Sequence, residues 1–213
     1  MSHYSRWEKS VALHEAGHAV VAKVLAVDVH AVVACRYGHA IEGHRAQGFC
    51  ELSGGAMPFN LAAVRWAGSM AGTELNGGTW RKVYWDDVFL DVCATRAQRK
   101  TATPPKVDMA QSAVVPSRWS VPESADNDAL TTFGTAGRMT DLTEIADILS
   151  AACEKSECYT QAFGDAWDTT QRTALRMVQA FADQIDRLAG LLLDHGGRLT
   201  EREIEDFFAS EGF

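Results

Sequence analysis

The chain has 213 residues, of which 46% are hydrophobic and 23% are charged, and its formal net charge at pH 7 is −8. This size and composition suit a single globular domain with its own hydrophobic core. The excess of acidic side chains argues against nucleic acid and anionic membranes as partners, because both carry negative charge.

The N-terminal residues carry no sign of an export signal. The segment MSHYSRWEKS lacks an apolar stretch behind a basic start, and no segment of the chain reaches the roughly 20 apolar residues that span a bilayer. The five cysteines form no CxxC pair and are odd in number, which is typical of reduced thiols rather than of disulfides or a cysteine zinc site. We therefore expect a cytoplasmic protein without a membrane span.

Two helices and a small sheet are predicted for the first part of the chain. Residues Trp7–Val27 have apolar side chains at helical spacing and no proline, which predicts a helix. Within Asp28–Leu52, the segments VHAVVAC and GFCELS are rich in strand-forming residues and flank a turn-rich stretch, so we expect a small sheet. Pro58 opens a second helix over Phe59–Leu75, whose many alanines and glycines indicate close packing against another helix.

An irregular segment precedes the helices predicted for the remainder. Thr101–Gly134 holds four of the five prolines and no sustained period, which is typical of a surface segment, and its role stays open. Helices are predicted from Thr140 onward and, as one helix or a helix pair, over Glu157–Leu193. A last short helix has Thr200 as its N-cap, with Glu203 completing a capping box. The expected fold is mainly α (α+β), with one small β-sheet and a long irregular insertion.

The strongest signal for chemistry is HEAGH at residues 14–18, an HExxH motif inside the first predicted helix. A helix turns about 100° per residue, so His14 and His18 lie on one face and can both bind a single Zn2+ ion. Glu15 can act as a general base toward water activated by that ion. Gly17 is a poor helix former, which indicates that another backbone approaches closely there. These residues predict a zinc-dependent hydrolytic site.

The longer segment HEAGHAVVA, residues 14–22, resembles the peptidase domain of the FtsH family, the membrane-anchored AAA proteases, and of the small stand-alone (M41-like) relatives. Residues 45–49 (RAQGF) resemble that family's substrate-aligning strand, and residues 185–204 resemble its C-terminal ending. Residues 66–74 are similar, with substitutions, to its Gly-Gly-Arg-x-Ala-Glu-Glu helix. The resemblance implies a zinc-dependent endopeptidase acting on peptides or unfolded proteins. The ATPase motif GxxxxGK[ST] is absent, so we expect activity without ATP, and the sequence leaves the oligomeric state open.

The resemblance also implies a third zinc ligand, an aspartate that opens a later helix. GRMTDL, residues 137–142, is similar to the family pattern G-x-x-N-D-[IL] and places Asp141 at the start of a well-patterned helix. Its distance from the C-terminal ending also resembles that of the stand-alone relatives. If Asp141 is the third ligand, residues 77–134 are an insertion. Residues 1–213 then form a single peptidase domain that contains this insertion.

Several alternatives stay open at this point. Asp86 and Asp87 are alternative third ligands, because they lie at the family's usual distance from the preceding helix. Glu74 is another, for a site with two histidines and a glutamate. Asp141 also has an explanation without a metal, since a carboxylate at a helix start interacts favourably with the helix dipole. The predicted function is peptide hydrolysis, with the substrate extended along the strand edge at residues 48–51. The alternative function is a non-catalytic zinc-containing binding or regulatory module of the same fold.

Overall fold

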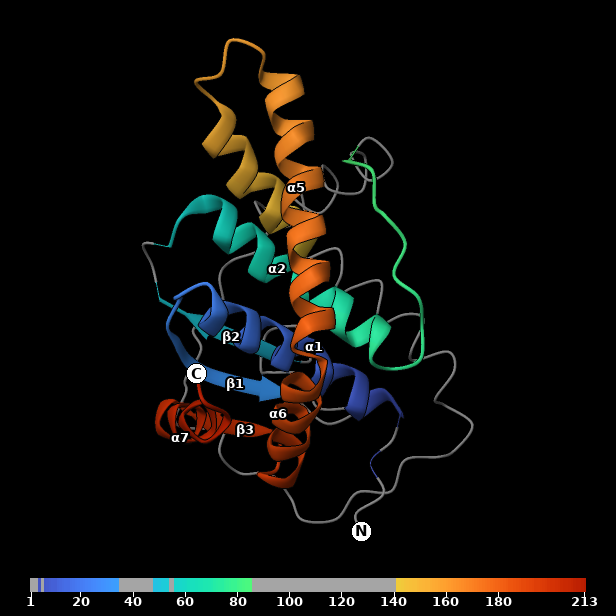
Figure 1. Cartoon of the computed structure of the whole chain (residues 1–213), viewed down its shortest axis with the longest axis vertical. Helices are drawn as coiled ribbons and strands as arrows, with labels where there is room; N and C mark the ends of the chain where they lie inside the picture. Colours follow the sequence, from blue (N-terminus) through green and yellow to red (C-terminus); the bar gives the residue numbers. More distant parts are fainter. Residues whose placement is uncertain (1–3, 5, 35–47, 54–55, 86–140) are drawn as a thin grey trace, which may run out of the picture.

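In the computed structural model, the described residues are 4, 6–34, 48–53, 56–85 and 141–213. Their fold is mainly helical with a small three-stranded antiparallel sheet, as the sequence predicts (Figure 1). Among these residues, no helix combines the length and the apolar character that crossing a bilayer requires.

Helices α1 (Arg6–Val24) and α2 (Pro58–Glu74) lie against each other at the centre of the fold (Figure 1). A Cβ atom at Gly17 would lie 2.6 Å from the Cβ of Ala71 and 2.8 Å from the carbonyl oxygen of Ala67. Only glycine allows so short an approach. The close helix pair predicted from the small residues is therefore confirmed, and it brings the backbone of α2 next to the HExxH segment.

The sheet has the strand order β2-β1-β3, with both pairings antiparallel. Strands β1 (Val29–Ala34) and β2 (Gly48–Leu52) lie within the predicted sheet region, and Ala34 pairs with Gly48. Strand β3 (Arg198–Thr200) was not predicted, because three residues are too few for a periodic pattern. In the sheet that the structure describes, β2 is an edge strand, so its outer side has no strand partner there.

Residues 141–153 are helical. The sequence predicts one helix or a helix pair after them, and the structure has a pair, α5 (Tyr159–Ala180) and α6 (Ala182–Asp194). Helix α7 (Glu201–Glu211) ends the fold, as predicted. Indole rings join α2 to α5, since the ring centroids of Trp66 and Trp167 lie 5.0 Å apart in an edge-to-face contact. The hydrophobic core thus extends from α1 through α2 to α5.

Residues 77–85, the described part of the predicted insertion, pack against α5. Val83 is buried, and its carbonyl oxygen accepts a hydrogen bond from Trp167 Nε1 at 2.8 Å. The side chain of Gln171 binds both the backbone N–H and the carbonyl of Val83, at 2.8 and 2.9 Å. The described part of the predicted insertion therefore packs into the core through Val83. Residues 86–134 lie outside the described residues, and their interpretation as an insertion stays a prediction.

Helix α7 begins with the predicted capping box. The Thr200 hydroxyl accepts a hydrogen bond from the Glu203 backbone N–H, and the Glu203 carboxylate accepts one from the Thr200 backbone N–H at 2.8 Å. We expect Thr200→Ala to lower the free energy of unfolding by about 1 kcal/mol, measured by urea denaturation. Ser210→Ala removes an exposed hydroxyl at the other end of α7 and is the control. Equal urea midpoints for both variants would contradict the expectation.

This contribution also depends on pH. Hydrogen bonds from the Thr200 backbone and side chain lower the pKa of Glu203 below its ordinary value. A carboxyl group with a lowered folded pKa stabilises the fold above its unfolded pKa, and the contribution disappears as the pH falls through the folded value. The stability difference between the wild type and Thr200→Ala should therefore shrink in acid.

Candidate metal centre

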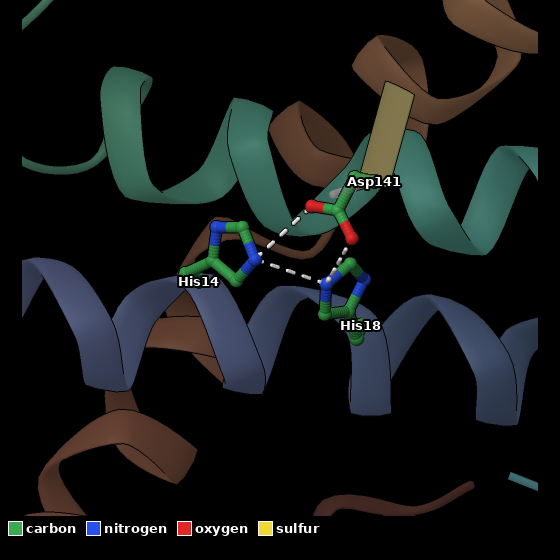
Figure 2. A group of neighbouring side chains, drawn as sticks. All are labelled: His14, His18 and Asp141. Carbon is green, nitrogen blue, oxygen red and sulfur yellow. Dashed lines mark hydrogen bonds and ion pairs between the residues drawn. The ribbon is translucent and has the colours of Figure 1, made fainter. Parts of the chain in front are cut away.

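Helix α1 presents two imidazole rings, one turn apart, toward α2 (Figure 2). The Nε2 atoms of His14 and His18 lie 3.1 Å apart. His18 is buried, and its Nδ1 lies 2.7 Å from the carbonyl oxygen of Val64 on α2. A carbonyl oxygen only accepts hydrogen bonds, so Nδ1 carries the proton and Nε2 keeps a free lone pair. The backbone of α2 thus fixes the tautomer that a metal ligand needs.

A carboxylate from a distant part of the sequence meets these rings. Asp141 Oδ2 lies 3.1 Å from His14 Nε2, and Asp141 Oδ1 lies 3.6 Å from His18 Nε2 (Figure 2). Asp141 is buried at the start of the described helix over residues 141–153, and it also accepts a hydrogen bond from Ser69 Oγ at 3.2 Å. The fold therefore brings together all three side chains that the sequence proposes as ligands.

The chemistry and spacing of these donors fit a zinc ion. One nitrogen from each histidine and one oxygen from Asp141 lie within 4.8 Å of one another. In a tetrahedral site with zinc bonds of about 2.0–2.1 Å, ligand atoms lie roughly 3.4 Å apart. The closest approaches within the cluster, 3.1, 3.1 and 3.6 Å, are near that value. Three protein ligands are also typical of catalytic zinc sites, whereas structural sites have four.

A glycine on α2 makes room for the second imidazole. A Cβ atom at Gly68 would lie 2.3 Å from Nε2 and 2.4 Å from Cε1 of His18. The ring is held on its other side by the carbonyl of Val64. Any side chain at position 68 would therefore push the ring out of the position in which it faces His14 and Asp141.

Burial and the neighbouring charges determine the protonation of the cluster. Burial lowers the pKa of His18 to about 4, so this ring is neutral at pH 7. Burial also disfavours a charged His14, but the nearby Asp141 and Glu15 carboxylates together outweigh burial and raise its pKa. Burial disfavours the ionised form of Asp141 as well, yet the two histidines and Arg65 together outweigh it and lower its pKa. The raised pKa of His14 and the lowered pKa of Asp141 favour an ion pair between the two side chains, so a metal ion competes with a proton on His14.

Glu15 lies between α1 and the first residue of β2. A Cβ atom at Gly48 would lie 2.5 Å from Glu15 Oε1 and 2.7 Å from its Cγ, so only a glycine leaves room for this side chain. Burial raises the pKa of Glu15 to about 7. A carboxyl group with such a pKa can both accept and donate a proton near neutral pH.

The competing ligand candidates are placed differently. The Glu74 carboxylate accepts a hydrogen bond from the backbone N–H of Trp80 just beyond the end of α2. Among the described residues, the group able to hold a metal contains only His14, His18 and Asp141. Asp86 and Asp87 lie outside the described residues, so the choice of Asp141 over them stays a prediction.

Three residues of α2 that support the cluster were not predicted from the sequence. Val64, Gly68 and Ser69 each contact one of the three proposed ligands. Gly68 could have been found by the argument applied to Gly17, because a glycine inside a helix costs about 1 kcal/mol relative to alanine and needs a reason. The roles of Val64 and Ser69 depend on tertiary contacts, which no local pattern reveals.

Comparisons with known proteins give no family assignment. No protein-family model matches the chain, and a search of curated proteins finds no match either. The likeness to FtsH-type peptidases therefore depends on the sequence motifs alone.

Proposed function

We propose that this protein is a zinc-dependent endopeptidase, similar to the FtsH-type peptidase domain and independent of ATP. The observation that carries the proposal is the convergence of the donor atoms of His14, His18 and Asp141, with separations of 3.1 to 3.6 Å. Glu15 follows the first of these residues on the same helix, so a candidate general base accompanies the cluster.

Each residue has a defined role in this proposal. His14, His18 and Asp141 hold the zinc ion, which supplies Lewis acidity that polarises a carbonyl group and lowers the pKa of water to about 7. Glu15 accepts a proton from the attacking water and returns it to the leaving amine. Its raised pKa, about 7, suits both transfers. The low exposure of the cluster keeps bulk water from screening these charges.

The edge of β2 supports an extended peptide as substrate. The outer side of β2 has no strand partner in the described sheet, and an exposed edge can add a peptide strand through backbone hydrogen bonds. Gly48 begins this strand and contacts Glu15. A peptide added along the edge of β2 therefore comes close to the general base, and such a site accepts peptides or unfolded proteins rather than folded ones.

A cytoplasmic location forms part of the proposal. The described cysteines, Cys50, Cys153 and Cys158, are all free thiols. Free thiols suit a reducing compartment.

The proposal is tested by zinc content and peptide hydrolysis of the purified wild type, Asp141→Ala and Asp147→Ala. Asp147 is an exposed carboxylate on the same helix and serves as the matched control. We expect about one zinc per chain in the wild type and in Asp147→Ala, and loss of zinc in Asp141→Ala. Hydrolysis of an unstructured peptide should stop when a chelator is added and return when zinc is restored.

Other outcomes have distinct meanings. Zinc retained in Asp141→Ala would move the third ligand to Asp86, Asp87 or Glu74. A zinc-loaded but inert wild type would favour the non-catalytic module of the same fold. A wild type that holds no zinc after reconstitution would contradict the enzyme proposal altogether.

A further inference from the structure

The three proposed ligands come from two separate helices. His14 and His18 share α1, so helix geometry alone sets the spacing of their rings. Asp141 belongs to the helix over residues 141–153. Its position relative to the imidazoles therefore depends on tertiary contacts.

Helix α2 supplies two such contacts from one face. Ser69 Oγ donates a hydrogen bond to Asp141 Oδ2 at 3.2 Å, and both residues are buried. One turn earlier on α2, Arg65 Nε lies 2.8 Å from Glu144 Oε2. Because Asp141 and Glu144 are three residues apart on their helix, these two contacts join facing sides of the same two helices.

The direction of the Ser69 hydroxyl is informative. Hydroxyl side chains inside a helix often bond back to a carbonyl in the preceding turn. Thr73 does so, with its Oγ1 2.8 Å from the carbonyl oxygen of Ser69, and Thr170 does so toward Ala166, also at 2.8 Å. In the described part of the chain, the hydroxyl of Ser69 instead makes its hydrogen bond to Asp141.

This hydrogen bond restrains the carboxylate that faces the two rings. Asp141 Oδ2 is also the oxygen 3.1 Å from His14 Nε2. The Ser69 hydroxyl occupies one lone pair of Oδ2 and leaves the remaining lone pairs of the carboxylate for the cluster. A carboxylate held in this orientation loses less rotational freedom when it binds a metal ion, which favours affinity.

We propose that Ser69 is a positioning residue that orients Asp141 for metal binding, while the Arg65–Glu144 ion pair holds the two helices in register. The inference rests on the proposed zinc site, and it does not depend on peptide hydrolysis. In this proposal, α2 orients the third ligand, Asp141, which lies outside the HExxH motif.

The experiment measures the Zn2+ affinity of the full chain by competition with a chromophoric chelator, together with the absorption spectrum of the Co2+-loaded protein. Ser69→Ala should weaken Zn2+ binding by about 10-fold and alter the Co2+ spectrum, because the Asp141 carboxylate loses its restraint. Ser69→Thr keeps a hydroxyl at this position and should bind Zn2+ more tightly than Ser69→Ala. Thr73→Ala removes the neighbouring hydroxyl, which donates its hydrogen bond to the carbonyl oxygen of Ser69, so it should keep wild-type affinity.

Arg65→Lys provides a second variant that leaves the buried position 69 unchanged. It keeps the positive charge that acts on the cluster but loses the guanidinium contact with Glu144, so it should also weaken Zn2+ binding. Wild-type affinity and an unchanged Co2+ spectrum in both Ser69→Ala and Arg65→Lys would overturn the inference. An equal loss in Ser69→Ala and Thr73→Ala would also overturn it, because the effect would then belong to α2 in general. Weakened zinc binding in a protein without peptidase activity would support the positioning role and contradict only the proposed function.

Discussion

Replacing Glu15 with glutamine is expected to lower kcat for peptide hydrolysis by about 10³-fold while zinc stays bound. Glutamine has nearly the same shape as glutamate but cannot take a proton from water. Zinc should remain, because Glu15 does not belong to the group of described residues that could hold a metal, which is His14, His18 and Asp141. The same substitution leaves the close contact with Gly48 sterically unchanged, so the loss of rate reports proton transfer rather than packing.

The measurement combines steady-state hydrolysis of an unstructured peptide with zinc analysis of the same samples. Glu8→Gln makes the same chemical change at another buried carboxylate on α1 and serves as the control. We expect Glu8→Gln to retain the wild-type kcat and Glu15→Gln to retain the wild-type zinc content. A folded, zinc-loaded Glu15→Gln protein with unchanged hydrolysis would remove Glu15 from the mechanism.

Local patterns in the sequence were sufficient for the parts of the fold that depend on neighbouring residues. The helical spacing of His14 and His18, the cap at Thr200 and the small residues of α2 are all local signals, and each corresponds to a feature of the structure. The capping box was predicted in full because both of its partners lie within four residues of each other. The close approach of α1 and α2 was predictable because glycine inside a helix is unfavourable without a packing reason.

Features that depend on contacts between distant segments were not predictable in the same way. Strand β3 has only three residues, and it is defined by its pairing with β1 rather than by its own pattern. The hydrogen bond from Ser69 to Asp141 joins residues 72 positions apart, so a serine in a small-residue helix gave no hint of it. Asp141 itself was chosen through a family resemblance, and only the structure gives its distances from the two imidazoles.

The position of the His18 ring depends on the absence of a side chain at Gly68. Gly68→Ala is expected to weaken Zn2+ binding by about 100-fold or more, because the new Cβ would lie 2.3 Å from Nε2 of His18, the atom proposed to bind the metal. The ring cannot move aside while its Nδ1 keeps the 2.7 Å hydrogen bond to the carbonyl of Val64. In the variant, the His18 ring must therefore either lose its hydrogen bond to Val64 or move its Nε2 away from His14 and Asp141.

Opposing effects on stability make this variant informative. Alanine improves helix propensity by about 1 kcal/mol, whereas overfilling a packed interior costs about 1–3 kcal/mol. The free energy of unfolding of the metal-free protein should therefore fall by no more than about 2 kcal/mol, far less than is needed to unfold a typical domain. Gly190→Ala, inside α6 with no atom within 4 Å of the added Cβ, is the matched control and should leave Zn2+ affinity unchanged. A Gly68→Ala protein that is folded and binds Zn2+ as tightly as the wild type would mean that His18 does not bind the metal through Nε2.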